Sequence, residues 1–395
     1  MGVGDGRKMI DSAVQIIFWT SAGLLLYVYV GYPLFVFLLS MVRPKPVFKR
    51  GNFEPTVTIL ITAYNEENDI RRKIENTLEV DYPAEKLEIM VASDASSDRT
   101  DEIVGEFAGR GVKLFRQEGR LGKTYTQNKA IENATGEIIL FSDATTNYPA
   151  DVLRKIIPNF ADNSIGCAAG KLIYIDDSSS NVGKGAKSYW NYETFLKESE
   201  SRACSLIGAS GCLYAVRKSA YEPMYPEACS DFLICTVVYR QGLRSIYEPA
   251  AVCTEETNRK TDKEMRMRVR VISQTFTDLW RNRDMLNPFK SGFFAVELIS
   301  HKLLRYAIPL FLALILGTSA FLAENSAFYL VAFVTHVMFY LSAFAGWLLE
   351  KAGIRMSILV IPLYFVIANL ASAIGFYKFL RGERFANWEP IRESR

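Results

Sequence analysis

The chain is poor in histidine, and its cysteines follow no metal-binding pattern. Its 395 residues include only two histidines, His301 and His336, and none of its six cysteines stands in a C-x-x-C pair. Zinc sites and disulfide frameworks require cysteines, or cysteines with histidines, at short defined spacings. The sequence therefore argues against both, and we expect the cysteines to be reduced, buried side chains.

Two common nucleotide-binding loops are missing as well. No G-x-G-x-x-G turn follows the first strand-like run, Val57–Thr62, so the usual dinucleotide fingerprint is absent. The segment 119–124 reads Gly-Arg-Leu-Gly-Lys-Thr, but a Walker loop needs glycine at position 117, where the chain has Gln117. Neither an ATPase nor a dinucleotide enzyme is indicated. The basic loop is either a solvated surface loop or a contact for a diphosphate.

Charge is absent from four long apolar runs. They lie between Asp11 and Arg43 (expected helix Val14–Val42), and at Tyr306–Ala323, Ala327–Leu349 and Ser357–Tyr377. Crossing a hydrocarbon core takes about 20 residues, so these runs predict transmembrane helices rather than buried helices of a soluble protein. The net charge of +3 is small, and we expect membrane lipids, not nucleic acid, as a partner.

The placement of basic residues predicts how the chain is oriented. Arg43, Lys45 and Lys49 follow the first run, whereas the segment around Glu324 has no lysine or arginine. The positive-inside rule then places residues 50–300 in the cytoplasm. Strict alternation would put the basic tail Lys378–Arg395 outside. Either the tail departs from the rule or one run does not cross, and Pro362 would allow the last run to kink or re-enter.

The middle of the chain alternates strand and helix patterns. Short aliphatic runs at Val57–Thr62, Leu87–Ala92, Val112–Phe115 and Ile138–Phe141 are each followed by polar residues and a helical pattern. This order predicts an α/β fold whose mostly parallel sheet carries helices on both faces. In such sheets ligands bind outside the carboxyl ends of the strands. Asp94 and Asp143 follow two of these ends, so we expect both at one crevice.

The predicted organisation has five parts. They are a transmembrane helix and linker (1–50), an α/β domain in the cytoplasm (51–283), an interfacial amphipathic helix (284–302), further transmembrane helices (303–380) and a basic tail (381–395). For segment 284–302, packing beneath the α/β domain is the alternative to lying in the membrane surface. Within the long helix Lys263–Trp280, the spacing of Arg266, Arg268 and Arg270 spreads them around the axis, so they cannot all point one way.

An ordered set of motifs resembles the family 2 glycosyltransferases with the GT-A fold, in particular integral-membrane members such as the polysaccharide synthases. The matching residues, in chain order, are Ala63-Tyr64-Asn65-Glu66, Ser93-Asp94-Ala95-Ser96, Arg120-x-Gly122-Lys123, Ser142-Asp143-Ala144-Thr145, Gly208-Ala209-Ser210-Gly211, Ser230-Asp231-Phe232 and Arg268-Val269-Arg270. Each motif is weak alone. Seven in the family's order, flanked by apolar runs, form a specific signal over residues 55–280.

The resemblance implies inverting transfer of a sugar from a nucleotide diphosphate, with a UDP-sugar favoured, to a lipid-linked or polysaccharide acceptor. It assigns Asp94 to the base, Asp143 to the donor and to Mg²⁺ or Mn²⁺, and Asp231 to deprotonation of the acceptor. Arg270 would neutralise the diphosphate. Further substrate contacts implied by the resemblance are Ala63, Tyr64, Glu66, Lys123, Ser142, Gly211 and Arg268.

The chain departs from the family pattern at two places. The second acid of the family's D-x-D is Thr145 here, a poorer metal ligand, and the Gln-x-x-Arg-Trp of processive members is absent. The leading hypothesis is a membrane-bound transferase in a bacterial-type inner or plasma membrane, with its catalytic domain in the cytoplasm. The alternatives are a processive polysaccharide synthase and a non-catalytic scaffold with a degenerate sugar-nucleotide fold.

Overall fold

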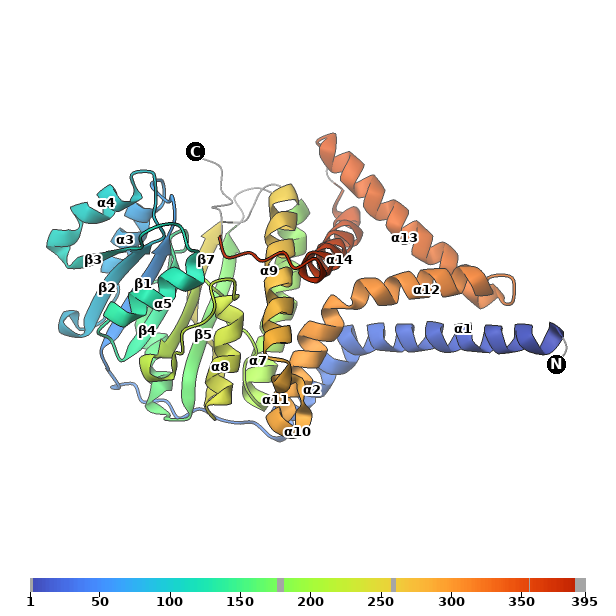
Figure 1. Ribbon diagram of the computed structural model, residues 1–395, viewed down its shortest axis with the longest axis horizontal. Helices are drawn as coiled ribbons and strands as arrows, with labels where there is room; N and C mark the ends of the chain where they lie inside the picture. Colours follow the sequence, from blue (N-terminus) through green and yellow to red (C-terminus); the bar gives the residue numbers. More distant parts are fainter. Residues whose placement is uncertain (1–2, 176–180, 257–260, 355, 388–395) are drawn as a thin grey trace.

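The computed structural model describes residues 3–175, 181–256, 261–354 and 356–387 (Figure 1). Its centre is a mixed sheet with the strand order β3-β2-β1-β4-β6-β5-β7. The strands are β1 (Val57–Ala63), β2 (Leu87–Ser93), β3 (Val112–Arg116), β4 (Ile138–Asp143), β5 (Ile165–Ile175), β6 (Leu213–Arg217) and β7 (Arg244–Glu256). The predicted fold class is confirmed.

Strand direction divides the sheet into two parts. Strands β1 to β4 pair in parallel, and β6 lies antiparallel between β4 and β5. Strand β7 pairs in parallel with β5, with a register shift between Gly170 and Lys171. The sequence patterns did not predict β7, which contains Pro249, a residue that weakens a strand assignment. The sequence also predicts strands at Ile165–Tyr174 and Leu213–Val216, which correspond to β5 and β6, so the sheet is one strand wider than expected.

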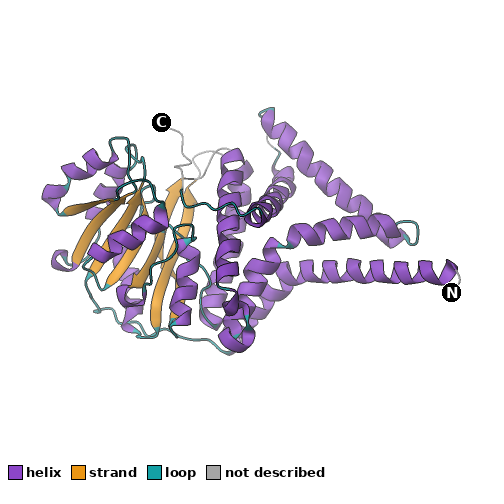
Figure 2. Cartoon of the chain, viewed as in Figure 1, coloured by secondary structure: helices purple, strands orange, loops and turns teal. Residues whose placement is uncertain are grey.

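Helices cover both faces of the sheet, as Figure 2 shows. One buried cluster joins the sheet to α3 (Ile70–Leu78), α4 (Thr100–Glu106) and α6 (Val152–Ile156). A second cluster on the other face joins it to α5 (Lys123–Asn133) and α8 (Ser230–Arg240). All seven residues of β1 are buried. The side chains alternate between the two clusters, with Ile59 and Ile61 in the first and Leu60 in the second.

Apolar helices extend from one side of this domain. The N-terminal helix runs through α1 (Val3–Leu26), a π-helical turn (Tyr27–Gly31) and α2 (Tyr32–Val42), and its span Arg7–Val42 is long and apolar enough to cross a membrane. The same holds for α13 (Ala327–Lys351) and for Ile358–Leu380 within α14 (Ser357–Leu380). Helix α12 (Ile308–Leu322) passes this test only when joined to Phe293–Leu304, at a 56° bend.

Two long helices connect the sheet to these apolar helices. Figure 1 shows α7 (Asn181–Ala203) and α9 (Thr261–Arg281) standing between them. Polar contacts fix α7 to the membrane side: Tyr32 donates a hydrogen bond to Glu200 Oε1 at 2.6 Å, and His301 Nδ1 lies 2.7 Å from the same oxygen. The apolar helices are therefore joined to the α/β domain by buried side chains, not by a linker alone.

The segment predicted as one interfacial helix is divided into short pieces. They are a 3₁₀ turn (Arg283–Leu286), α10 (Pro288–Ser291), α11 (Phe293–Glu297) and a π-helical stretch (Leu298–Leu304). Phe294 is buried and stacks on Tyr239 of α8, with ring centroids 4.1 Å apart. This contact fits the alternative of packing beneath the catalytic domain, while Phe289 is fully exposed. Placement of this segment at the membrane surface stays a prediction.

Two basic positions used in the orientation argument lie outside the described residues. One is Arg355, which together with Lys351 makes the segment between the last two apolar runs basic, and the other is the part of the tail beyond residue 387. The six cysteines are all free and buried, as expected.

Candidate active site

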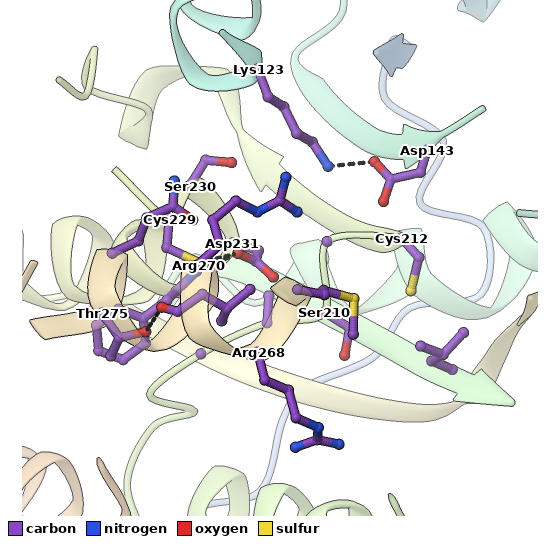
Figure 3. Close-up of a pocket in the computed structure, with 18 of the residues that line it drawn as sticks. Lys123, Asp143, Ser210, Cys212, Cys229, Ser230, Asp231, Arg268, Arg270 and Thr275 are labelled. Carbon is purple, nitrogen blue, oxygen red and sulfur yellow. Dashed lines mark hydrogen bonds and ion pairs between the residues drawn. The ribbon is translucent and has the colours of Figure 1, made fainter. Parts of the chain in front are cut away.

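A cavity of about 430 Å³ lies between the carboxyl ends of the strands and helices α7, α8 and α9 (Figure 3). Small-molecule sites usually measure roughly 300–1,000 Å³. Its wall includes Thr62 and Asp143 from the strand ends and Lys197 from α7. The strand register explains part of this wall, because Thr62 of β1 pairs directly with Asp143 of β4.

Asp143 forms an ion pair with Lys123, the first residue of α5 (Figure 3). The two side chains are 31% and 26% exposed, so both remain accessible from the cavity. Burial disfavours the charged form of Lys123, but Asp143 and Asp231 more than offset this effect, and the pKa of Lys123 is raised. The lysine is therefore held as a cation facing two carboxylates.

Asp231 lies in the first turn of α8. Its Oδ1 accepts hydrogen bonds from the backbone N–H of Phe232 and from Cys229 Sγ, both at 3.1 Å. Asp278 of α9 fixes Cys229, the residue before α8, by accepting a hydrogen bond from its backbone N–H at 3.1 Å. A carboxylate in the first turn of a helix is favoured by the helix dipole. Local structure thus keeps Asp231 at the cavity wall.

Gly211 leaves room between the two charged groups. A Cβ atom at this position would lie 3.3 Å from Asp231 Oδ2 and 3.6 Å from Lys123 Nζ. A larger side chain would occupy the space that a ligand needs beside Asp231. Gly208, Ala209 and Ser210, which belong to the same motif as Gly211, line the cavity as well.

Arg268 and Arg270 both line the cavity but point in different directions (Figure 3). Arg270 points toward Lys123 and Asp231, and its pKa is lowered by burial, which nearby Cys229, Asp143 and Asp231 partly offset. Arg268 points away from them, donates a hydrogen bond to the Tyr364 hydroxyl, and lies 5.1 Å from the Tyr364 ring centroid. The expected spread of these arginines around the helix is confirmed.

Asp94 is fully buried at the end of β2, behind the basic loop. It accepts hydrogen bonds from the backbone N–H groups of Leu121 at 2.9 Å and Gly122 at 3.0 Å, and from Thr126 Oγ1 at 3.0 Å. The described residues that line the cavity do not include Asp94. In this conformation the carboxylate shapes the loop that carries Lys123, and its contact with a base stays a prediction.

The loop after β1 packs against the loop after β2. Asn65 has a positive φ of 52° and accepts a hydrogen bond from the backbone N–H of Ser97 at 2.8 Å. The Arg120 guanidinium lies 4.0 Å from the Tyr64 ring centroid. Of the predicted contacts in this motif, Glu66 lines the cavity, whereas Ala63 and Tyr64 are outside the described lining.

Two buried groups hold the turn that follows Asp143. Ser142 Oγ lies 3.2 Å from Thr146 Oγ1, and Lys73 Nζ donates to the Thr146 carbonyl at 2.9 Å. Lys73 is fully buried, and its ammonium lies 3.7 Å from the Tyr148 ring centroid. Burial lowers the pKa of Lys73 to about 7, against opposing contributions from Cys253, Asp143 and Cys212. Ser142 and Lys73 thus support the turn from below.

Sequence reasoning missed several charged residues of the cavity. Glu255, near the end of β7, lines it and accepts a hydrogen bond from Thr145 Oγ1 at 3.0 Å. Glu193, Lys197 and Lys302 line the side nearer the apolar helices. The rule that led to Asp143 would have led to Glu255 had β7 been assigned, because both acids end strands. No local sequence pattern indicated the other three residues, because their place in the cavity depends on how the long helices pack against one another.

The donor set suits a hard divalent cation held together with a substrate. No group of three or more His, Cys, Asp or Glu side chains that could hold a metal occurs among the described residues. Asp143 and Glu255 nevertheless line the same cavity. The bridge between Asn147 and Thr254, with N···O distances of 3.0 and 2.7 Å, fastens the turn after Asp143 to β7. Mg²⁺ is commonly bound by one or two carboxylates plus substrate phosphates, and these residues fit that pattern.

Comparisons with known proteins agree with the fold and the motifs. Residues 58–224 match the family model described as glycosyl transferase family 2. The chain is 30% identical over 205 residues to the poly-β-1,6-N-acetyl-D-glucosamine synthase of Staphylococcus aureus, covering 50% of this chain and 49% of that protein. It is also 30% identical over 116 residues to a β-monoglucosyldiacylglycerol synthase of Synechocystis, covering 28% of this chain and 24% of that protein. The chain thus spans about half or less of the length of these curated relatives.

A solved structure is similar over almost the whole chain. The mannosyltransferase PcManGT from Pyrobaculum calidifontis, in complex with GDP-Man and Mn²⁺, has a TM-score of 0.73 and covers 93% of this chain and 100% of its own. The sequence identity is 21%, so this likeness concerns the fold. The predicted GT-A architecture and the predicted resemblance are both confirmed.

Proposed function

Because residues 58–224 form a family 2 glycosyltransferase domain, we propose that the protein is a membrane-bound inverting glycosyltransferase. It transfers a sugar from a nucleotide diphosphate, with a UDP-sugar favoured, to a lipid-linked or polysaccharide acceptor. The observation that supports this most directly is the cavity that presents Asp143 with Lys123 on one wall and Asp231 with Arg270 on the other. One wall suits the donor and the other the reacting acceptor.

Asp231 is the general base in this proposal. An acceptor hydroxyl has a high pKa and needs a base within hydrogen-bonding distance, about 3 Å, as the new bond forms. The open space beside Asp231 Oδ2, where Gly211 has no side chain, allows a hydroxyl to approach. A single displacement inverts the anomeric carbon, so the base acts on the face opposite the leaving diphosphate.

Lys123 and Arg270 would contact the leaving group. Charge accumulates on the diphosphate as the glycosidic bond breaks, and fixed cations facing it stabilise that charge most in the transition state. Arg270 provides a planar set of donors that suits phosphate oxygens. Lys123 would exchange part of its ion pair with Asp143 for a contact with phosphate.

Asp143, with Glu255 beside Thr145, would hold Mg²⁺ or Mn²⁺ together with diphosphate oxygens. The cation, when bound, supplies a Lewis acid that offsets charge on the leaving diphosphate. In this arrangement Glu255 provides the second carboxylate that Thr145 cannot. Thr145 acts as a positioning residue through its hydrogen bond to Glu255.

We place the catalytic domain at the cytoplasmic face of a bacterial-type inner or plasma membrane, since basic residues follow the first span. Similarity to a poly-β-1,6-N-acetyl-D-glucosamine synthase favours polymer synthesis as the second candidate function. Product length separates the two: long chains made by the purified protein support a processive synthase, and single additions support the leading proposal.

Substitution Asp231→Asn tests the proposed base. We expect sugar transfer to fall about 10²- to 10⁴-fold, the usual contribution of general base catalysis, while UDP binding changes less than about threefold. Transfer is measured as nucleotide diphosphate release over a panel of nucleotide sugars, and binding by calorimetry. Asp151→Asn, at an exposed position, is the matched control. Full activity in Asp231→Asn would exclude this residue as the base.

A further inference from the structure

The last apolar helix, α14, is held along the catalytic domain over most of its length. In its first half, Tyr364 accepts a hydrogen bond from Arg268 of α9. Farther along, a Cβ atom at Gly375 would lie 2.9 Å from Ile272 Cγ2 and 3.1 Å from the Val269 carbonyl, so the two helices approach closely. Phe379 then packs on Phe276 of α9, with ring centroids 5.7 Å apart. Helix α9 carries Arg270, so these contacts lie beside the candidate active site.

This contact leaves too little of α14 to cross a membrane. At 1.5 Å per residue, the part before Tyr364, Ser357–Leu363, is about 10 Å long. A hydrocarbon core is about 30 Å thick. A helix whose remaining length lies against α9 cannot reach the opposite face while α9 stays at the active site.

The segment that follows α14 returns to the catalytic domain as well. Gln274 Nε2 donates to the Phe385 carbonyl at 2.7 Å. The Ala386 carbonyl lies 2.2 Å from where a Cβ of Gly122 would be, and Ala386 lines the cavity. The chain after α14 is therefore on the same side of the membrane as the strands.

The direction of the other apolar helices agrees with this placement. Figure 1 shows α12 running alongside α1 away from the sheet, α13 returning, and α14 drawn nearly end-on beside α9. Helix α14 thus lies across the direction of α1 instead of along it. Tyr29, in the π-helical turn between α1 and α2, contacts Phe365 with ring centroids 5.9 Å apart, which places the first half of α14 beside that turn.

From these contacts we propose that α14 does not cross the bilayer but lies in its surface on the side of the catalytic domain. The crossings are then α1, α12 with the stretch before it, and α13. This arrangement also removes the charge conflict, because Lys351 before α14 and Lys378, Arg381 and Arg384 near its end all fall on the side of Arg43 and Lys45.

The partner of the outer face of α14 is lipid. Ile358, Ile361 and Leu380 are 77%, 72% and 64% exposed, and no charged residue interrupts the helix before Lys378. The face continues the apolar surface of α13, whose Gly346 lies against Leu359 and Leu363. A helix embedded at the headgroup boundary would cover these side chains with acyl chains. Helix α9, which carries Arg270, then lies at the membrane surface. The lipid-linked acceptor of the proposed function would be found at the same surface.

Cysteine labelling of the full-length protein in sealed proteoliposomes tests the proposal. Each variant adds one exposed cysteine to a chain whose own six are buried: Ala352→Cys before α14, Arg381→Cys after it, Glu324→Cys between α12 and α13, and Arg110→Cys in the catalytic domain. The unaltered protein measures background. With an impermeant maleimide, we expect the cysteines at 352, 381 and 110 to react from one side and that at 324 from the other. Labelling of 352 and 381 from opposite sides would overturn the proposal.

Depth measurements provide a second, independent readout. Spin labels at Ile358→Cys, Leu370→Cys and Leu380→Cys are compared by their accessibility to oxygen and to a water-soluble nickel complex. We expect three similar, shallow depths, whereas a helix that crosses the bilayer would place the first and last labels at depths up to about 33 Å apart. Spin–spin broadening with loss of oxygen accessibility would show a second copy of the chain covering this face, which also overturns the proposal.

Discussion

The two walls of the cavity are built in different ways. One, the strand-end wall, consists of Asp143 and Glu255 with Lys123 at the start of α5. The other, the helix wall, consists of Asp231, Arg270, Lys197 and Lys302, contributed by α8, α9, α7 and the π-helical stretch before α12. The first is fixed by the pairing of neighbouring strands. The second depends on long helices that also contact the apolar helices, so its geometry is linked to the membrane.

From this difference we infer which substrate each wall binds. A wall fixed by strand register suits the donor, whose diphosphate and cation are the same in every turnover. We propose that the wall that touches the membrane helices serves the acceptor, with Arg270 reaching from it to the leaving diphosphate of the donor. The following changes test this division, starting with the largest expected effect.

Replacing Asp143 by Asn should remove most of the cation affinity of the strand-end wall. The neutral amide is a weaker ligand for a hard cation, and Lys123 loses its partner. We expect Mn²⁺ affinity in the presence of UDP to fall about 100-fold, or about 2.8 kcal/mol at 1.4 kcal/mol per tenfold. Free Mn²⁺ is measured by electron paramagnetic resonance. Unchanged affinity would assign the cation to another wall, and Asp151→Asn is the control.

The two arginines of α9 form a matched pair for the helix wall. We expect Arg270→Lys to lower kcat/KM about 10- to 100-fold, because lysine cannot replace two fixed donors to a diphosphate. Arg268→Lys should lower it less than about threefold, since Arg268 is turned toward Tyr364. Steady-state kinetics with the best nucleotide sugar measures both. Equal losses would show that the direction seen for Arg268 changes when substrate binds.

Glu255→Gln tests the second acid of the strand-end wall. We expect Mn²⁺ affinity to fall about tenfold, a smaller loss than for Asp143→Asn, because Asp143 and the phosphates remain. The comparison uses the same titration, with Glu102→Gln at an exposed helix position as the control. An affinity equal to that of the unaltered protein would leave Asp143 as the sole carboxylate ligand.

The smallest effect concerns the support below Asp143. The folded-state pKa of Lys73, about 7, is below the unfolded value of about 10.4. Between these values the unfolded chain binds more protons, so the contribution of Lys73 to stability rises with pH and is lost as pH falls toward 7. We expect the free energy of unfolding of the unaltered protein, measured by chemical denaturation, to rise relative to that of Lys73→Met between pH 7 and pH 9, by at most about 1.4 kcal/mol per pH unit. A stability difference between the two proteins that does not change with pH would contradict a lowered pKa for Lys73.

Sequence patterns predicted the strand-end wall better than the helix wall, and the reason is physical. Asp143 follows a buried strand, and parallel strands end at one edge, so its position follows from local sequence. Glu255 was not predicted because Pro249 argued against assigning β7 as a strand. The direction of Arg270 and the presence of Lys302 depend on contacts between helices distant in sequence, which no local pattern encodes. For Asp94 the same rule was only partly sufficient. It placed the residue at the correct edge of the sheet, but it could not predict on which side of the basic loop the carboxylate would lie.

The contact between Gly122 and Ala386 has a consequence for biosynthesis. Gly122 lies on the loop before α5, whereas Ala386 follows α14, so the two positions are far apart in sequence. During synthesis the strand-end wall is therefore made well before Ala386. The cavity rim is complete only once α14 and the segment behind it have folded back onto the basic loop.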